Sequence, residues 1–410
     1  MRFGKRKLYA GIWQKLLRQK AMIFLIGPRQ VGKTTFAKIL GKNLANQIYL
    51  NWDSLSDKRK ITENPTFFTE IPRVDFSKPL VILDEIHKKA KWKDYLKGIY
   101  DEFAPEFKFL VLGSGRLDLF QQGGDSLAGR YFLLYLFPFT ISELTTKSRS
   151  LTAFRKNPLI NFALNSPSVS QRIWERLFQL SGFPEPYLKN KVSFWRIWTQ
   201  NYTRQILYED LRDFANIKKA DALATLFALL PSKIGSPLSI NSLATTLQIS
   251  FDTAAAWLRL FKLVYLTFEI SPWHKRLTRV LKKEKKVYLF NYPLIEKVGA
   301  RFENMVALEL QRAVQTWNVQ GFGNFGLHYI RTKDGQEVDF LLTENNQPLL
   351  LLEAKYQDQT ISPGLLKIQR MLQVPAVQLL QKCPKFSYIQ NQENKILIVA
   401  ASRFLASLPK

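Results

Sequence analysis

Cysteine, histidine and long apolar runs are all scarce in this 410-residue chain, and each scarcity excludes a class of protein. The single cysteine, Cys383, excludes an internal disulfide and is typical of a reducing compartment. One cysteine and three histidines argue against a structural zinc site. The longest apolar run, residues 131–139, contains a proline and is too short to span a membrane. Since no apolar core follows the basic residues 1–7, we expect no signal peptide, a cytoplasmic protein and no membrane partner.

Acidic residues are also few. The chain has 60 lysines and arginines against 33 aspartates and glutamates, which gives a formal net charge of +27. Such an excess favours an anionic partner, and nucleic acid is the usual one, so we expect DNA. The alternative is a basic protein without a specialised partner. A hydrophobic content of 46% is ample for folded cores, and the length predicts about two to four domains.

Residues 27–34 fit the phosphate-binding pattern G-x-x-x-x-G-K-[ST] without a mismatch. The apolar run 21–26 before them is typical of a buried strand, and residues 35–40 after them are typical of the start of a helix. Strand, glycine loop and helix in this order are what a phosphate-binding loop requires. A chance glycine-rich turn is the alternative, and this context disfavours it. The pattern therefore predicts an ATP site.

Each part of this loop has a role in binding ATP and Mg²⁺. Gly27 and Gly32 let backbone N–H groups point at the phosphates, and the helix N-terminus adds partial positive charge. Lys33 can reach the β- and γ-phosphates, and Thr34 can hold Mg²⁺. The expected ATP-binding residues are Gly27, Pro28, Arg29, Gln30, Val31, Gly32, Lys33, Thr34 and Thr35.

Hydrolysis needs a second strand that carries an acid for the metal and a base for water. Residues 80–83 are apolar and are followed by Asp84 and Glu85. We expect Asp84 to bind Mg²⁺ directly or through water, and Glu85 to polarise the attacking water. Ordinary strand termination is the alternative, and the position about fifty residues after the loop disfavours it.

Two more residues are candidates for the same catalytic site. Ser114 ends the strand expected at 107–114 and is a candidate sensor of the γ-phosphate, with a simple strand cap as the alternative. Arg130 is a candidate cation for a γ-phosphate, including that of a neighbouring subunit in a homo-oligomer. A surface arginine is the alternative for Arg130, and Arg116 is a weaker candidate for the same role.

Strands alternate with helices in the first part of the chain, which predicts an α/β fold. We expect the parallel sheet of a P-loop NTPase, with helices on both faces and ligands at the carboxyl ends of the strands. The periodicity of the next part of the chain is helical. Residues 239–270 then show a helix, a short turn, a second helix and a strand pair at 264–270, which is the layout of a winged helix-turn-helix. Its expected recognition helix, 251–261, offers few base-reading side chains, so an internal packing module is an equal alternative. The basic run 275–286 is better suited to phosphates, with a solvated charge run as the alternative.

A second group of charged residues lies near the C-terminal end. Asp339 lies on one expected strand, and Glu353 and Lys355 end the next and point to the same face. This arrangement resembles the active site of the PD-(D/E)xK nuclease superfamily. The resemblance implies a second metal held by Asp339 and Glu353, with Lys355 acting on water and Glu303 as an auxiliary ligand. The alternatives are a structural remnant of that fold or a surface cluster of charges.

The motifs together resemble prokaryotic AAA+-type ATPases that have an AAA_14-like P-loop domain and a C-terminal DUF4143 region. The residues that carry the resemblance are 27–35, 80–87, 113–116, 126–130, Pro138 and Phe139 with Glu143, 182–185, 302–304 and 335–340. The resemblance implies ATP binding, a winged-helix segment and an α/β restriction-endonuclease-like C-terminal domain. Ser181 and Gly115 depart from the family pattern, and neither belongs to the phosphate-binding residues.

We therefore expect four parts. They are an ATPase domain at 1–150, a helical lid or linker at 151–231, a winged helix at 232–275 and the DUF4143 domain at 276–410. The expected function is that of a Mg²⁺-dependent AAA+ ATPase that acts with DNA. Two alternatives stay open: an ATP-gated nuclease that cuts DNA at Asp339, Glu353 and Lys355, and a nucleotide-controlled switch that binds another protein without acting on DNA.

Overall fold

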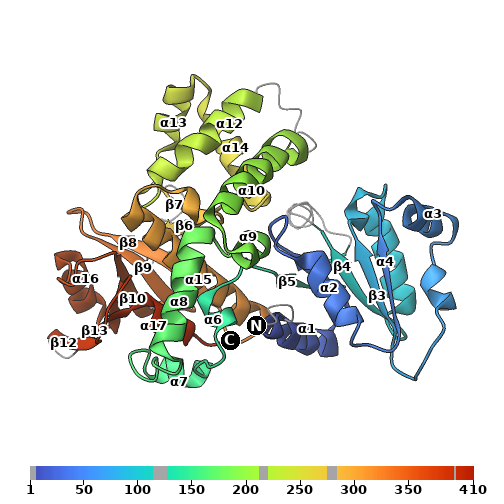
Figure 1. The fold of residues 1–410 in the computed structure, drawn as a ribbon, viewed down its shortest axis with the longest axis horizontal. Helices are drawn as coiled ribbons and strands as arrows, with labels where there is room; N and C mark the ends of the chain where they lie inside the picture. Colours follow the sequence, from blue (N-terminus) through green and yellow to red (C-terminus); the bar gives the residue numbers. More distant parts are fainter. Residues whose placement is uncertain (1–5, 114–126, 212–219, 275–283, 392–393) are drawn as a thin grey trace. The chain divides into compact units, whose positions relative to one another are not determined.

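The computed structural model describes residues 6–113, 127–211, 220–274, 284–391 and 394–410 (Figure 1). The chain forms two compact units. The first comprises Met1–Phe137 with Leu263–Tyr265, and the second comprises Pro138–Lys262 with Leu266–Lys410. Ser114, Arg116 and most of the basic run 275–286 lie outside the described residues.

The first unit is built on a five-stranded sheet in the order β2-β3-β4-β1-β5. All four strand pairs are parallel. The strands are β1 (Met22–Ile26), β2 (Gln47–Asn51), β3 (Leu80–Asp84), β4 (Lys108–Leu112) and β5 (Tyr131–Tyr135). β1 and β3 are apolar at nearly every position and wholly buried, as expected for central parallel strands covered on both faces.

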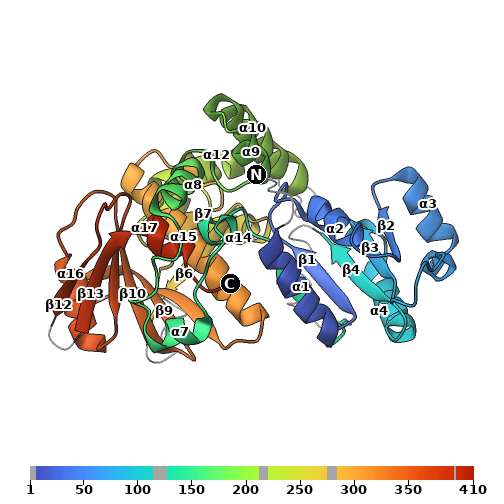
Figure 2. The same cartoon turned by 60° about the horizontal axis from the view of Figure 1, so that its bottom comes forward.

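Helices cover both faces of this sheet (Figures 1 and 2). They are α1 (Lys7–Gln19), α2 (Lys33–Gly41), α3 (Leu55–Glu63) and α4 (Trp92–Phe103), with short 3-10 turns at Phe67–Glu70 and Ile86–Lys88. Gly41 of α2 lies against Ile82, whereas the next strand residue, Leu83, packs in the cluster that contains α4. Successive strand residues point to opposite faces, so α2 and α4 lie on opposite sides.

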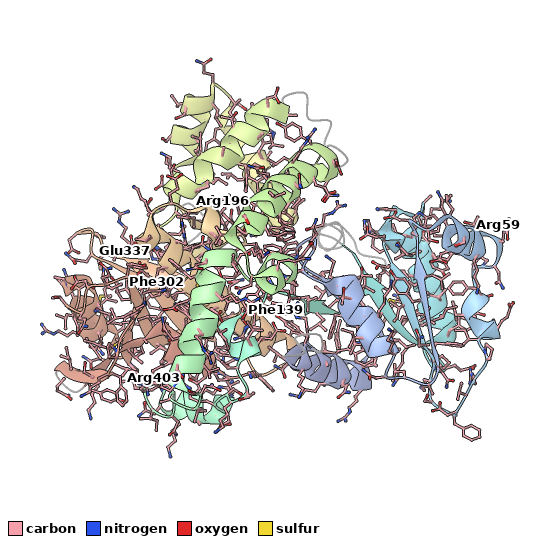
Figure 3. All side chains as sticks on the ribbon, in the orientation of Figure 1. Arg59, Phe139, Arg196, Phe302, Glu337 and Arg403 are labelled. Carbon is pink, nitrogen blue, oxygen red and sulfur yellow. The ribbon has the colours of Figure 1, made fainter. Side chains whose placement is uncertain are left out.

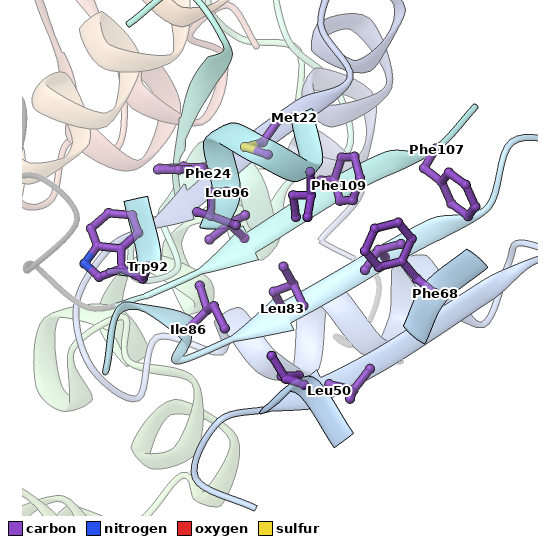
Figure 4. Close-up of a cluster of buried hydrophobic side chains, with 14 of the residues drawn as sticks. Met22, Phe24, Leu50, Phe68, Leu83, Ile86, Trp92, Leu96, Phe107 and Phe109 are labelled. Atoms are coloured by element: carbon purple, nitrogen blue, oxygen red, sulfur yellow. The ribbon is translucent and has the colours of Figure 1, made fainter. Parts of the chain in front are cut away.

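The α4 face of the sheet carries a large hydrophobic cluster (Figure 4). Leu96 of α4 is fully buried there, and the ring of Phe68 makes edge contacts with Phe103, Phe107 and Phe109. Each fully buried side chain of this size contributes roughly 1.5–3 kcal/mol to folding. This cluster holds strands β1, β3 and β4 in register, and their carboxyl ends carry the candidate site.

The second unit begins with helices. They are α6 (Ile141–Leu144), α7 (Leu151–Lys156), α8 (Pro167–Leu180), α9 (Pro184–Lys189), α10 (Val192–Gln205) with a π-helical continuation (Ile206–Asp210), α12 (Ala220–Leu229), α13 (Ile240–Leu247) and α14 (Phe251–Leu263). Helices α13 and α14 are the pair expected for a helix-turn-helix. Within the described ranges, no helix is both long enough and apolar enough to cross a membrane.

An eight-stranded mixed sheet follows in the order β12-β13-β11-β10-β9-β8-β6-β7. Its strands are β6 (Thr267–Pro272), β7 (Lys286–Leu289), β8 (Phe325–Arg331), β9 (Glu337–Glu344), β10 (Gln347–Lys355), β11 (Ala376–Leu380), β12 (Ser387–Asn391) and β13 (Asn394–Ala400). Its helices are α15 (Val298–Val319), α16 (Pro363–Leu372) and α17 (Ala401–Ala406). Helix α15 is buried along most of its length, and α16 covers a hydrophobic cluster on β9 to β11 and β13.

The strand pair expected at 264–270 is wrong. The structure has one strand there, β6, which pairs with β7 in antiparallel fashion and with β8 in parallel fashion. The strand therefore joins the C-terminal sheet. Its partners are β7, which begins at the last residue of the basic run, and β8 farther along the chain, and pairing across such long connections leaves no local turn signal in the sequence.

Candidate nucleotide site and C-terminal carboxylate cluster

The phosphate-binding loop connects β1 to α2, and its path depends on glycine at two positions. Gly27 has φ 149°, and a Cβ atom there would lie 2.2 Å from the carbonyl oxygen of Leu136. Gly32 has φ 94°, in the left-handed region that favours glycine. The Leu136 N–H also donates to the Ile26 carbonyl at 2.8 Å, so the residue after β5 fixes the start of the loop.

Lys33 is the first residue of α2, and its side chain turns back into the loop. Its Nζ donates to the carbonyl oxygens of Gly27 at 2.9 Å and Pro28 at 2.8 Å. Val31 is buried at the tip of the loop, whereas Thr35 is exposed in the first turn of the helix. The ammonium and the helix N-terminus together concentrate positive charge at the loop, which suits an anionic ligand.

Asp84, the last residue of β3, is joined to the loop helix. Thr34 Oγ1 donates to Asp84 Oδ2 at 2.7 Å, and the carboxylate is only 4% exposed. Hydroxyl and carboxylate oxygens are the hard ligands that Mg²⁺ prefers, so this pair fits a magnesium ion that also binds phosphates and water. The structure therefore brings together the two residues predicted to hold Mg²⁺.

Tyr49 is a residue of this site that sequence reasoning missed. It lies on β2, and its hydroxyl donates to the same Asp84 Oδ2 at 2.9 Å. Burial, reinforced by the nearby Asp84 charge, raises the pKa of the Tyr49 hydroxyl, so it stays a donor at neutral pH. The sequence shows only that Tyr49 lies on a short strand of alternating polar and apolar residues. Its hydroxyl reaches Asp84 because β2 pairs with β3, and the sequence does not show that pairing.

Glu85 follows Asp84 with φ 54°, which turns its side chain away from the strand direction. Its carboxylate lies 3.4 Å from Lys88 Nζ and 3.6 Å from His87 Nε2, and Lys88 also contacts Asp53 at 2.6 Å. Burial raises the pKa of Glu85, while Lys88 opposes the rise. Lys88 and Asp53 were also missed, because neither belongs to a known motif.

Arg6 is a buried cation that sequence reasoning did not select. Its guanidinium donates to the carbonyl of Val31 at 3.1 Å and to that of Phe137 at 2.6 Å, and it lies 4.7 Å from the centre of the Tyr9 ring. The Tyr9 hydroxyl in turn accepts the Phe137 N–H at 3.2 Å. Arg6 therefore connects the tip of the loop to the segment that follows β5.

Arg130 is not brought to the loop of its own chain. Its guanidinium binds both carboxylate oxygens of Asp101 on α4, at 2.6 and 2.9 Å. It precedes Tyr131, which pairs with Met22 at the amino end of β1, whereas the loop follows the carboxyl end. Five strand residues at about 3.3 Å each separate these ends by roughly 16 Å. A role at the γ-phosphate of a neighbouring subunit stays a prediction, as does the sensor role of Ser114, which lies outside the described residues.

The C-terminal charged residues do come together. The backbone N–H of Asp339 donates to Glu353 Oε2 at 3.3 Å, and the N–H of Ala354 donates to Asp339 Oδ2 at 3.0 Å. Lys355 Nζ lies 3.0 Å from Glu353 Oε1. Antiparallel pairing of β9 with β10 places these residues side by side. Burial, with the Asp339 charge adding to it, raises the pKa of Glu353 to about 7.

Lys286 of β7 lies at the centre of this cluster, and sequence reasoning had placed it only in the basic run. Its Nζ contacts Glu337 Oε1 at 2.6 Å, Glu303 Oε1 at 3.1 Å and Asp339 Oδ1 at 3.4 Å. Burial alone would lower the pKa of Lys286, but these carboxylates outweigh it and raise the pKa. Tyr288 donates to Glu303 at 2.8 Å, and burial together with Asp339 raises the pKa of Glu303 to about 7.

These acids surround an ammonium group and do not present the open arrangement that a metal requires. Among the residues that the structure describes, no group of three or more histidines, cysteines, aspartates or glutamates is placed to hold a metal ion. The donor set of Asp339, Glu353 and Glu303 therefore does not fit the metal that the resemblance implied. The roles in metal binding assigned to these residues stay predictions without geometric support.

Three known families match consecutive parts of the chain. Residues 19–145 match AAA_14, described as an AAA domain. Residues 171–299 match a domain of unknown function, DUF8612, and residues 298–399 match another, DUF4143.

Proteins from a bacterium and an archaeon have sequences similar to this chain over most of its length. An uncharacterized protein of Mycobacterium tuberculosis is 23% identical over 363 residues, which cover 84% of this chain and 72% of the relative. An uncharacterized protein of Methanocaldococcus jannaschii is 23% identical over 385 residues, which cover 86% of this chain and 79% of the relative.

Solved structures are more distant. A Walker-type ATPase of Pyrococcus abyssi is 15% identical, with a TM-score of 0.44 over 72% of this chain and 95% of that one. AMPPCP-bound DnaA from Aquifex aeolicus is 16% identical, with a TM-score of 0.24 over 63% of this chain and 88% of that one. These likenesses are too distant to assign a function.

Proposed function

We propose that this chain binds ATP with Mg²⁺ and hydrolyses it. The chain carries a P-loop ATPase domain of the AAA_14 family and a DUF4143 region, as its motifs predicted. The hydrogen bond of 2.7 Å between Thr34 and Asp84 carries the proposal. It joins the phosphate-binding loop to the acidic strand end, and so supports Thr34 and Asp84 as joint ligands of one Mg²⁺ near Lys33 and Glu85.

Each residue has a distinct task in this proposal. Loop N–H groups and the Lys33 ammonium bind the β- and γ-phosphates, and Thr34 and Asp84 hold Mg²⁺. When bound, Mg²⁺ neutralises charge on the phosphate oxygens. Glu85 accepts a proton from the attacking water, and the burial that raises its pKa makes it a stronger base. Lys88, held by Asp53, orients the Glu85 carboxylate.

Two substitutions test this assignment. Lys33→Ala should weaken nucleotide binding, because it removes the cation that faces the phosphates. Glu85→Gln should leave nucleotide affinity unchanged and reduce turnover by about 10²–10⁴-fold, because the amide cannot accept the proton. Nucleotide affinity and phosphate release are measured on the same samples, with the exposed Glu102→Gln as the control. Full hydrolysis by Glu85→Gln would exclude Glu85 as the base.

DNA is the macromolecular partner that we propose. The net charge of +27 supports it, and we propose the lysine-rich segment 88–97 of the first unit as the contact surface. Five lysines occur between residues 88 and 97, with one aspartate. Lys58 and Lys89 lie 5.6 and 5.8 Å from the centre of the partly exposed Trp52 ring. Cations beside an accessible aromatic ring suit phosphates and stacked bases.

The winged-helix segment adds less support for DNA. On α14, Arg259 is exposed, but Lys262 is paired with Glu269 at 3.3 Å, and Lys285 is paired with the same carboxylate at 2.9 Å. The protein-binding switch without DNA activity therefore remains the alternative function. Absence of salt-sensitive DNA binding by the purified protein would support this alternative.

The chain is organised in four consecutive parts in this proposal. We retain the division at 1–150, 151–231, 232–275 and 276–410, while the sheet shows that β6 of the third part pairs with strands of the fourth. A homo-oligomer would give Arg130 a phosphate to contact, and the cytoplasm is the compartment that fits one free cysteine. The nuclease alternative lacks geometric support at Asp339 and Glu353.

A further inference from the structure

Two elements of the second unit direct three acidic side chains at one lysine ammonium, which a third element supplies. Helix α15 supplies Glu303, strand β9 supplies Glu337 and Asp339, and strand β7 supplies Lys286. Glu337, labelled in Figure 3, is the nearest of the three acids at 2.6 Å. The Lys286 side chain is 0% exposed, so protein atoms replace its hydration shell. A buried ammonium of this kind needs several carboxylate partners to be stable.

The backbone of β7 holds this ammonium firmly in place. Lys286 pairs with Ile270 of β6 on one side and with Pro237 on the other. The Leu238 N–H also donates to the Lys285 carbonyl at 2.9 Å. Because the backbone of β7 has a partner on each side, a strand and an isolated bridge, the position of the Lys286 Cα atom is fixed.

The ammonium takes the place that a divalent ion would need. Its contacts of 2.6 to 3.4 Å are ammonium–carboxylate distances, whereas a divalent ion bound by oxygen requires about 2.0–2.6 Å. Glu303, Glu337 and Asp339 are already oriented toward it, and Asp339 is tied to Glu353 through the Asp339 N–H. A metal and the ammonium cannot both occupy the centre, because their charges repel and the space is filled.

We propose that Lys286 is an internal cation that replaces a divalent metal in this carboxylate cluster. The native chain then takes no divalent ion between β9, α15 and β7, and the cluster acts as a structural junction of α15 with the sheet. Removal of the ammonium exposes a latent site for a hard divalent cation, formed by Glu303, Glu337 and Asp339. This inference is independent of ATP hydrolysis, because it concerns the other unit.

Mn²⁺ binding to the full-length protein without nucleotide tests the proposal. Electron paramagnetic resonance should detect one additional Mn²⁺ per chain in Lys286→Ala, bound at least tenfold more tightly than any Mn²⁺ in the native protein. Lys286→Arg keeps a cation and should not gain the site, and Lys286→Ala with Asp339→Asn should lose it. Mn²⁺ should also raise the Tm of Lys286→Ala and leave that of the native protein unchanged.

Two results would overturn the proposal. One is Mn²⁺ binding by the native chain that Asp339→Asn abolishes, since it would show that the ammonium does not exclude a metal. This measurement needs no variant at Lys286 and so holds even if Lys286→Ala fails to fold. The other is a folded Lys286→Ala, verified by circular dichroism, that binds Mn²⁺ no better than the native protein. A loss of ATP turnover in Glu85→Gln bears on neither result.

Discussion

Individual polar groups that lie far from the motifs complete both carboxylate sites. Asp84 receives one hydrogen bond from Thr34 within the loop helix and another from Tyr49 on a neighbouring strand. Asp339 lies near Lys286, which belongs to a strand well before it in the chain. In each case the motif supplies the acid, and the fold supplies the group that holds or neutralises it.

The Tyr49 hydroxyl should strengthen Mg²⁺ binding, because its hydrogen bond orients Asp84. Tyr49→Phe keeps the ring, which lies 4.4 Å from Lys38 Nζ, and removes only the donor to Asp84. Partners that orient metal ligands typically contribute 10–100-fold in metal affinity or activity. We expect the Mg²⁺ concentration for half-maximal ATP turnover to rise by about tenfold or more. Turnover is measured against Mg²⁺ at constant ATP.

Tyr95→Phe is the matched control for this measurement. The Tyr95 hydroxyl donates to the Pro65 carbonyl at 3.0 Å and has no contact with Asp84, so its loss should not alter the Mg²⁺ dependence. An unchanged Mg²⁺ dependence in a folded Tyr49→Phe protein would show that Thr34 alone orients the carboxylate.

At the scale of elements, α15 is the helix around which the second unit packs. Its buried polar residues each reach another element. Asn304 exchanges two hydrogen bonds of 2.8 Å with the backbone of Leu289 on β7, and Glu309 accepts the Ile141 N–H of α6 at 2.6 Å. Buried polar groups with specific partners fix the position of a helix more narrowly than apolar contacts alone.

Glu309 makes the stability of this unit depend on pH. Burial raises its pKa to about 8, although Arg312 opposes the rise. Between the unfolded value of 4.5 and about 8, the folded state keeps a proton that the unfolded state releases. The contribution of Glu309 to stability is therefore fully present below pH 4.5 and is lost as the pH rises toward 8, with a slope of at most about 1.4 kcal/mol per pH unit.

Glu309→Gln should remove this part of the pH dependence, because the amide cannot ionise and its oxygen can still accept the Ile141 N–H. Denaturant unfolding of the native protein and the variant at pH 5.5, 6.5 and 7.5 gives the difference in free energy of unfolding. As the pH rises, the free energy of unfolding of the native protein should fall relative to that of the variant. A constant difference across this range would mean that Glu309 does not carry a raised pKa.

At the scale of the whole molecule, the sequence predicts the fold class and the order of elements well. The parallel sheet with helices on both faces is confirmed, and the AAA_14 and DUF4143 matches confirm the resemblance. Strand β1 lies within the apolar run 21–26, and strand β3 consists of the apolar run 80–83 and Asp84. Strong apolar periodicity and a glycine loop between strand and helix depend only on residues close together in the chain. The sequence alone therefore predicts the elements that they form.

Strand pairing and ion pairs between residues far apart in the chain could not be predicted from the sequence. The run 131–139 is apolar, yet only pairing with β1 makes its first part the edge strand β5. The same pairing reveals that Arg130 lies at the end of the sheet away from the loop. Lys286 has the composition of a surface basic run and is nevertheless fully buried, because the acids that pair with it lie on α15 and β9.

The lysine-rich surface near Trp52 gives a prediction for the binding of the whole protein to DNA. We expect Lys89→Glu, Lys91→Glu and Lys93→Glu combined to weaken binding by tenfold or more near 150 mM salt. The slope of log affinity against log salt should fall by up to about three, because up to three phosphate contacts are lost. Fluorescence anisotropy of a labelled duplex measures both quantities.

Three exposed lysines of the second unit provide a control with the same change in charge: Lys333→Glu, Lys385→Glu and Lys395→Glu. Equal weakening by the two triple variants would mean that binding follows net charge and not this surface. No salt-sensitive binding by the native protein would favour the protein-binding switch.

The close approach of Leu136 to Gly27 has a consequence for how such chains diverge. The loop is shaped by a backbone carbonyl, 2.2 Å from where a Cβ atom of residue 27 would lie, and not by the Leu136 side chain. Every residue type carries that carbonyl group, so substitutions at position 136 keep the backbone contact that shapes the loop. As chains of this kind diverge, residue 136 can therefore vary, whereas position 27 has to stay glycine.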